Sequence, residues 1–292
     1  MEQPTVDIAT LERALPTDGA RRRSVGRPRW LLPTIALATL ALITIVGPMV
    51  WNHGQYEHNP VARLQVPSLD HPAGTDAFGR DLLARLLLGA RWTLAGAAAV
   101  SVAGNLIGLL VAGLATRHRL LDSATGRLID ALLAIPSLVV ALALTSVLGP
   151  SFRNLLIALT IASWPWYARI YRGVLIREYA SDYVEGATVA GASNASILVR
   201  HVLPNVPGPT IVLVTTNAGS AMLNLAALSF LGLGAQPPTP EWGTMISDAR
   251  VYVQIRPWQV LAPGLCIMLT VSVINLAGDA LRDAFDPRLR HR

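Results

Sequence analysis

Long apolar runs, separated by shorter polar segments, dominate the chain. A helix needs about 20 mostly apolar residues to cross a bilayer. Six runs come near that length: about 30–50, 92–115, 128–148, 152–173, 206–231 and 258–280. Unpaired backbone groups are too costly in lipid, so each run is predicted to be helical. The pattern therefore predicts an all-α polytopic membrane protein with six transmembrane helices.

The composition supports this prediction, and the arginines orient it. Hydrophobic residues make up 52% of the chain and charged residues 14%, against about 25% charged residues in soluble domains. With a cytoplasmic N-terminus, 17 of the 24 arginines fall on the cytoplasmic side and 7 outside. The positive-inside rule then predicts that both termini are cytoplasmic. We interpret the first run as a retained anchor, because no small-x-small cleavage site follows it.

Charge and cysteine usage narrow the kinds of site to expect. Arginine-rich cytoplasmic loops account for the net charge of +6, so we expect membrane lipid and no nucleic acid as a partner. No cysteine–histidine cluster has metal-ligand spacing, and the single Cys266 cannot form an intrachain disulfide. We therefore expect no metal site.

Two long segments are predicted to lie outside the membrane, at 52–90 and 232–257, and both are rich in Pro, Gly, Asp and Trp. The first is predicted to end in a short amphipathic helix from Asp81 to Ala90.

The polar segment from Ser181 to Asn205, which follows the fourth run, begins with a helix-start pattern. Asp182 with Glu185 three residues later fits an N-cap and its capping-box partner. Gly191 is predicted to end this short helix, because glycine favours the left-handed position after a helix.

A second short helix is predicted to follow in the same segment. Ser193 or Asn194 caps it, it runs to about Leu203, and Pro204 forces the chain out of it. The segment is therefore a compact helix–turn–helix, either a docking surface with small residues or an ordinary well-capped loop.

This segment resembles the cytoplasmic signature of ABC importer permeases: Glu-Ala-Ala, three residues, Gly, a spacer, Ile, and a terminal Leu-Pro. The matching positions are Glu185, Gly186, Ala187, Gly191, Ile197, Leu203 and Pro204. Gly186 stands where the signature has its first alanine. Glycine costs about 1 kcal/mol relative to alanine inside a helix, so we expect a looser helix that still docks.

Three further segments narrow the resemblance. Residues His71–Leu94, Leu228–Gly243 and Asp279–Arg290 look like the matching parts of dipeptide/oligopeptide permease subunits, in the order of the C subunit (OppC/DppC family). The resemblance covers about 70–290 and implies the type I ABC importer permease fold. It divides the chain into a cytoplasmic tail (1–29), a first transmembrane helix with an extracytoplasmic segment (30–90), a permease core (91–281) with a coupling loop (178–205), and a cytoplasmic tail (282–292).

The resemblance implies a permease subunit of a bacterial cytoplasmic-membrane importer, forming half of the pathway for oligo- or dipeptides. The implied partners are a second, B-type permease subunit, two ATP-binding domains and an extracytoplasmic substrate-binding protein. The chain has no lysine and therefore no Gly-x-x-x-x-Gly-Lys-Ser/Thr phosphate loop. We expect no enzyme activity and no cofactor in this chain, with ATP and Mg in the partner subunits.

Several polar residues are candidates for further roles. Candidates for the pathway are Asn217, Asn224 and Asn275, with helix–helix hydrogen bonding as the alternative. Candidates for contact with the binding protein are Asp76, Asp81, Glu241 and Asp248, with local capping as the alternative. The Trp164–Tyr167 segment is either a kinked part of the pathway or a packed proline kink. Glu185 either caps its helix or pairs with a basic residue of the ATPase.

Other functions compete with peptide import. A non-catalytic structural or protein-insertion membrane protein is one alternative, but it would not need the Glu185–Pro204 signature. A secondary transporter commonly has inverted repeats and ionisable residues at the membrane centre, and neither is evident here. Nickel and glutathione importers share this permease type, so they remain alternatives for the cargo.

Overall fold

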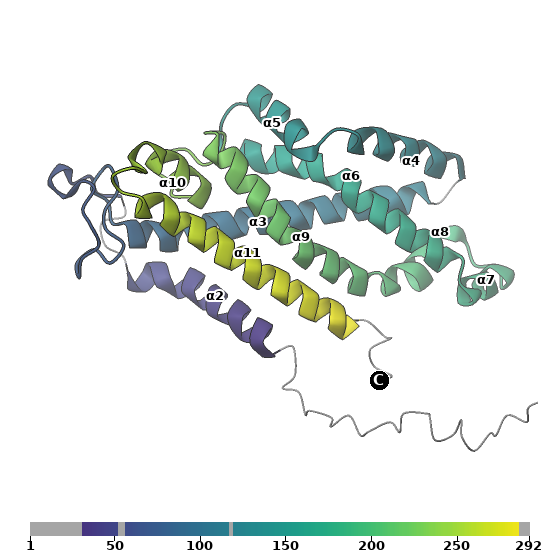
Figure 1. Ribbon diagram of the computed structural model, residues 1–292. Helices are drawn as coiled ribbons and strands as arrows, with labels where there is room; N and C mark the ends of the chain where they lie inside the picture. Colours follow the sequence, from purple (N-terminus) through teal and green to yellow (C-terminus); the bar gives the residue numbers. More distant parts are fainter. Residues whose placement is uncertain (1–30, 52–55, 117–118, 286–292) are drawn as a thin grey trace, which may run out of the picture.

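The computed structural model describes residues 31–51, 56–116 and 119–285, which form an elongated bundle of helices with no β-strand (Figure 1). The long helices are α2 (Leu31–Val50), α3 (Leu82–Ala115), α4 (Arg119–Leu133), α5 (Ser137–Leu148), α6 (Phe152–Tyr179), α9 (Pro207–Phe230) and α11 (Trp258–Phe285). The short ones are α7 (Asp182–Val189), α8 (Asn194–Ile197) and α10 (Trp242–Ala249). The all-α prediction is therefore confirmed for the described residues.

The helices account for four or five membrane crossings by length and composition. α2, α3, α9 and α11 are each long and apolar enough to cross a bilayer, and α4 with α5 forms a fifth span if the bent pair is counted as one. α6 has 28 residues but carries four arginines, at 153, 169, 172 and 177, and is not among the described helices that meet this criterion. The sixth crossing and the cytoplasmic location of the termini stay predictions.

Two elements differ from the predicted ones. The short helix expected from Asp81 to Ala90 is the first part of α3, which runs unbroken for 34 residues because Leu82, Leu86 and Ala90 already pack in the core. The run at 128–148 is instead broken, and α4 and α5 meet at an angle of 82°. Pro136 explains the break, because proline lacks the N–H that a helix needs and disfavours helical backbone in the residue before it.

The centre of the bundle is the contact of α3 with α6 and α9. Gly104 and Gly108, four residues apart on α3, let the backbones of α3 and α6 approach closely. A Cβ added to Gly108 would lie 2.6 Å from Cβ of Tyr167 and 2.8 Å from the backbone nitrogen of Ala168, both on α6. Small residues at this spacing are typical of close helix packing in membranes.

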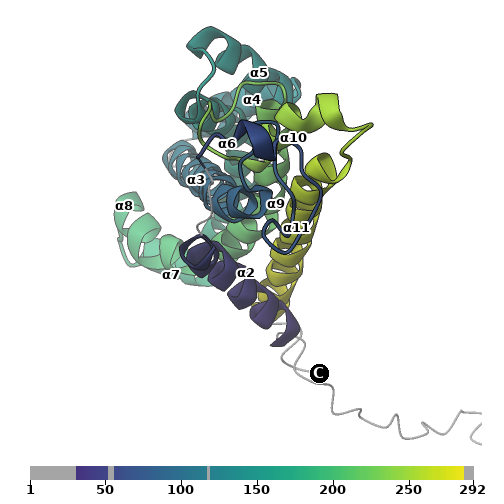
Figure 2. The ribbon, with the colours of Figure 1, turned by 90° about the vertical axis from the view of Figure 1, so that its left-hand side faces the viewer.

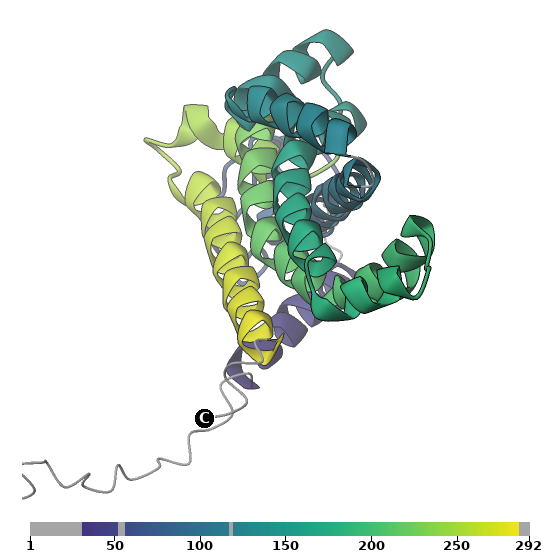
Figure 3. The same ribbon diagram turned by 90° about the vertical axis from the view of Figure 1, so that its right-hand side faces the viewer.

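The two ends of the bundle are built differently. One end carries what we call the cap, residues 56–81 and 232–257, which includes α10 and lies toward the viewer in Figure 2. The other end carries the α7–α8 loop, residues 180–206, which extends to one side of the bundle in Figure 3. α2 and α11 lie side by side (Figure 1).

Candidate functional site

The first helix of the α7–α8 loop begins one residue away from where the sequence pattern put it. Its N-cap is Ser181, whose hydroxyl donates to the carbonyl of Glu178 at 2.5 Å and makes no cap bond. The capping box predicted for Asp182 and Glu185 is therefore wrong, because Glu185 occupies the fourth helical position, where its N–H bonds to the carbonyl of Ser181. Both carboxylates still lie in the first turn, where the helix dipole favours negative charge.

The glycine stop is confirmed. Gly191 has φ +84°, and the amides of Gly191 and Ala192 bond to the carbonyls of Thr188 and Ala187 at 3.0 and 3.1 Å, the pair of bonds that defines a Schellman motif. Ser193 caps the next helix, since its hydroxyl accepts from the N–H of Ser196 at 3.3 Å.

The second helix of the loop is not one regular element. α8 continues as a π-helical turn, Leu198–Val202, and a 3₁₀ turn, Leu203–Asn205, and α9 starts at Pro207. Pro204 lies in the first turn of the 3₁₀ segment, where its missing N–H costs no intrahelical bond. The chain therefore reaches α9 without an extended exit.

The loop has a buried side and an exposed side. Val184, Ile197 and Val202 are buried in one apolar cluster with residues of α3 and α6, and the partly buried Ala187 and Leu203 pack against it. Four of the predicted docking residues are exposed: Glu185, Gly186, Gly191 and Pro204. A Cβ on Gly186 or Gly191 would meet no atom within 4 Å, and the Glu185 carboxylate has no hydrogen-bond or ion-pair partner among the described residues.

A cavity of about 500 Å³ lies beside α9. Asn217, Ser220 and Asn224 line it at helical spacing from one face of α9. The facing wall from α6 supplies Ser163, Trp166 and Tyr167, and the residues of the α4–α5 break close a third side. No Asp, Glu, Arg or His is among the described residues of this lining, so the cavity offers amides, hydroxyls and aromatic rings.

Two of the three candidate pathway asparagines are thus brought together, and the third is not. Asn275 lies on α11, and its Oδ1 would be 2.8 Å from a Cβ on Gly219 of α9, so it belongs to the α9–α11 contact. Asn105 has the helix–helix role, because its side-chain oxygen accepts a hydrogen bond from the Tyr171 hydroxyl.

Two of the four candidate acidic residues in the outer segments are buried helix caps. Asp81 accepts from the N–H of Ala84 at 2.7 Å, from Nε1 of Trp51 at 3.1 Å, and contacts Nδ1 of His71 at 2.7 Å. Because its side chain is fully buried, its oxygens are used within the cap. Asp81 therefore has the local capping role, which was the alternative to contact with a binding protein.

Glu241 is the second buried cap. It accepts from the N–H groups of Gly243 and Thr244 at 3.0 Å each, and from the Thr93 hydroxyl at 3.1 Å. Burial raises the pKa of Glu241, and these hydrogen bonds oppose the rise. The side chain has no exposed surface, so it too acts locally.

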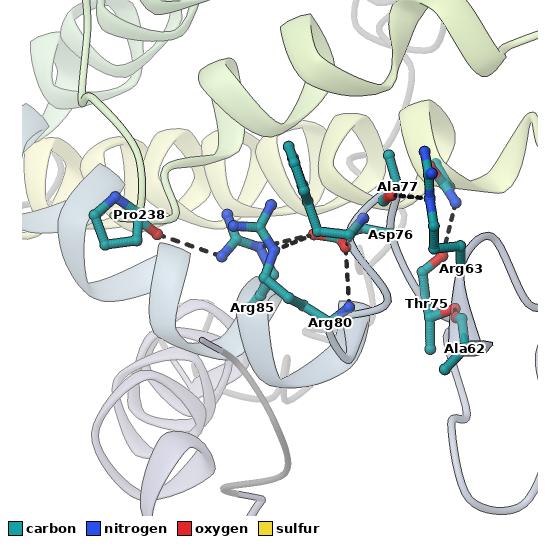
Figure 4. A network of polar contacts seen from close by, with 10 residues as sticks. Ala62, Arg63, Thr75, Asp76, Ala77, Arg80, Arg85 and Pro238 are labelled. Carbon is teal, nitrogen blue, oxygen red and sulfur yellow. Dashed lines mark hydrogen bonds and ion pairs between the residues drawn. The ribbon is translucent and has the colours of Figure 1, made fainter. Parts of the chain in front are cut away.

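The other two acidic residues, Asp76 and Asp248, accompany a pair of buried arginines, and Figure 4 shows Asp76 with both of them. Asp76 accepts from Nε of Arg80 at 2.6 Å and lies 3.4 Å from Nε of Arg85, which also donates to the carbonyl of Pro238 at 3.3 Å. Asp248 is exposed on α10 and lines a cavity with both arginines. Of the four acids, Asp248 is the one with an exposed side chain.

The comparisons with known proteins decide the family. Residues 104–291 match the family described as the binding-protein-dependent transport system inner membrane component.

The chain belongs to this family.

Its relatives include named peptide transport permeases. The dipeptide transport system permease protein DppC of Alkalihalophilus pseudofirmus is 42% identical over 258 residues, which cover 88% of this chain and 84% of that protein. The di/tripeptide transport system permease protein DppC of Pseudomonas aeruginosa is 47% identical over 222 residues, which cover 75% of this chain and 72% of that protein. The predicted resemblance to the C-type peptide permeases is thereby confirmed.

A solved structure supports the fold. An inward-facing structure of the MetNI methionine ABC transporter matches with a TM-score of 0.56 and 18% identity, covering 69% of this chain and 96% of that chain. The shared architecture is that of a type I ABC importer permease.

The family match has a structural meaning for the site. It starts at Gly104 within α3 and includes the α7–α8 loop, the cavity residues of α6 and α9 and the second segment of the cap, but neither Val100 of the cavity lining nor residues 56–81. The polar cavity residues Ser137, Ser163 and Ser220 are not among the predicted pathway residues. Ser220 has a sequence signal, because it lies three residues from Asn217 and four from Asn224 on one helix.

Proposed function

We propose that this permease is the membrane subunit of an ATP-driven peptide importer of the bacterial inner membrane. In this proposal the exposed side of the α7–α8 loop docks a cytoplasmic ATPase subunit, and the cavity beside α9 is this chain's half of the pathway. The observation that carries the proposal is the loop itself, a slim exposed face of Glu185, Gly186 and Gly191 on a buried apolar base.

The loop is connected to both polar walls of the cavity. α7 follows α6 after Ala180 and Ser181, and α9 begins directly after the loop. α6 supplies Trp166 to the cavity and α9 supplies Asn217. A force on the loop would therefore act on two helices of the pathway, and nucleotide-driven closure of the ATPases would select between two arrangements of them.

The cavity chemistry supports a peptide as cargo. Amide and hydroxyl side chains can donate to and accept from peptide backbone groups, while Trp166 and the apolar residues accommodate varied side chains. The names of the relatives point to the same cargo class.

The proposal includes partners for the steps that this chain does not perform. A B-type permease supplies the other half of the pathway, two ATP-binding domains carry ATP and Mg, and an extracytoplasmic binding protein delivers the peptide. The exposed Asp248 at the cap is the acid available for that delivery contact, whereas the Asp76 side chain is 14% exposed and paired with Arg80 and Arg85.

Reconstitution of the complete transporter in liposomes tests this function. We expect uptake of a labelled dipeptide that requires internal ATP and the binding protein. Uptake of nickel or glutathione in place of the peptide would assign a different cargo, and no ATPase subunit co-purifying with the wild-type chain would overturn the function.

A size series at one position tests the docking face. Gly186→Ala adds a methyl group to open space and should keep ATPase binding and uptake. Gly186→Trp should abolish both, since it blocks close approach. Glu185→Ala should lower uptake if its carboxylate pairs with the ATPase. Full uptake in Gly186→Trp would remove this face from the interface.

A further inference from the structure

The half of α6 that leads into the α7–α8 loop is joined to α4 by a bidentate ion pair. Nε and Nη2 of Arg172 both donate to the carboxylate of Asp122, the latter at 2.8 Å. A Cβ on Gly126, one turn along α4, would lie 2.8 Å from Nη1 of Arg172, so glycine provides the space that the guanidinium occupies. The two side chains are only 30% and 24% exposed. A bidentate pair of this kind sets position as well as attraction.

The apolar residues of α4 give it little other hold on the bundle. Leu120, Leu121 and Leu128 are all exposed, with Leu120 at 86%, whereas Ile129 is buried. A second pair, Arg169 with Asp130, is more than half exposed on both sides, and exposed pairs contribute little. Arg172 and Asp122 are therefore the most specific attachment of α4 to α6.

The far end of α4 forms a wall of the cavity. Leu133, Ile135 and Pro136, at the 82° break before α5, line it opposite the polar residues of α6 and α9. Movement of α4 along α6 would move this wall, because the break is the continuation of α4. Arg172 itself lies ten residues before Asp182, where α7 begins.

We infer that Arg172 and Asp122 form a latch that makes α4 follow α6, so that displacement of the α7–α8 loop repositions the α4–α5 break at the cargo cavity. Both are positioning residues, and the inference rests on the proposed function. In this inference, movement passes from the α7–α8 loop to α6, then through the Arg172–Asp122 latch to α4, and from α4 to the cavity wall. Lysine in place of Arg172 could not replace it, since an ammonium lacks the planar fork.

Transport by the reconstituted complex tests the latch. Asp122→Asn and Arg172→Gln should bind the ATPase subunits and hydrolyse ATP as the wild type does, yet take up roughly tenfold less dipeptide, the loss expected from one charge-assisted bidentate pair. The exchanged double variant Asp122→Arg/Arg172→Asp should recover most of this uptake. Arg177→Gln, which removes an exposed arginine on α6, is the control and should transport normally.

Spin-label distances report the movement directly. In a Cys266→Ser background, labels at the exposed positions Leu120, Val199 and Val61 mark α4, the part of the loop outside the docking helix α7, and the cap. On ATP trapping, the α4–loop distance should stay constant while the α4–cap distance changes. In Asp122→Asn the α4–loop distance should change or broaden.

The outcomes separate the two proposals. Three results would overturn the latch but not the proposed function. The first is uptake by Asp122→Asn equal to that of an active wild type, and the second is a double variant as impaired as the single variants. The third is an α4–loop distance that changes in the wild type. A wild-type complex that binds no ATPase and takes up no peptide would overturn the proposed function and the latch with it.

Discussion

The cap and the α7–α8 loop stabilise their backbones in opposite ways. In the cap, buried charged groups take up backbone and side-chain donors: Glu241 and Asp81 each bind three partners, and Arg80 and Arg85 are buried around Asp76. In the loop, apolar side chains such as Ile197 hold the base, and the exposed charged group Glu185 has no partner among the described residues.

The cap and the α7–α8 loop therefore differ in how much movement each can undergo without losing stability. A buried polar network is costly to break, because every group that loses its partner stays desolvated. Such a network maintains one geometry. An apolar base under a smooth, small-residue surface can shift as a unit without leaving hydrogen bonds unmade. The cap is thus suited to a fixed structure and the loop to movement.

Glu241→Ala should have the largest effect on stability. Two N–H groups of α10 and the Thr93 hydroxyl would lose their acceptor inside the cap, so we expect the unfolding free energy to fall by about 4 kcal/mol. The thermal midpoint of the purified protein in detergent measures it. Glu241→Gln keeps the volume and one acceptor oxygen and should lose less than half as much. Equal midpoints for Ala and wild type would mean that the buried acceptor does not hold the cap.

Ile197→Ala tests the base of the loop. Ile197 is 3% exposed, and removing its side chain should cost about 3 kcal/mol. Val199, two residues on and 60% exposed, gives the matched control, since Val199→Ala should change stability by less than about 0.5 kcal/mol. Hydrogen exchange of the loop amides would report both. Similar effects of the two substitutions would contradict an apolar anchor.

Gly191→Ala should cost about 1 kcal/mol. The φ of +84° is unfavourable for alanine, and the open space around the position means that no clash adds to the cost. Gly191→Asn should cost less, because asparagine tolerates this conformation better. Proteolysis of the loop is a suitable measurement, and a greater loss for Asn than for Ala would go against the backbone explanation.

Gly186→Ala should have the smallest effect, and of opposite sign. Gly186 lies inside α7 with open space around it, so alanine should stabilise the helix by about 0.5–1 kcal/mol. Slower hydrogen exchange in α7 is the expected result. Faster exchange would show that glycine has a packing role that its surroundings do not reveal.

The apolar runs were sufficient to predict most of the helices, because burial in lipid requires continuous apolar sequence. The break in the run at 128–148 also had a local signal in Pro136, which the length of the run concealed. The predicted start of α7 differs from the observed one by one residue, because both Ser181 and Asp182 are suitable N-cap residues. The Ser181 hydroxyl donates to the carbonyl of Glu178 in the last turn of α6. Such a choice depends on how α6 ends.

The site was predictable only where its residues are neighbours in sequence. The exposed residues of the loop and the asparagine face of α9 follow from spacing within one segment. The partners of Glu241 and Arg172 do not: Thr93 is 148 residues from Glu241, and Asp122 is 50 residues from Arg172. Which acid is buried depends on packing between helices that no local pattern describes.

The uncharged lining of the cavity beside α9 has a kinetic consequence under the proposed function. A few neutral hydrogen bonds, each worth about 1 kcal/mol, fall short of the roughly 8 kcal/mol that micromolar affinity requires. We expect a peptide that meets only this wall to dissociate quickly, because the described residues of the lining offer its charged ends no counter-ion. Under the proposed function we therefore expect the rate of import to follow the turnover of ATP rather than the release of the peptide from this wall.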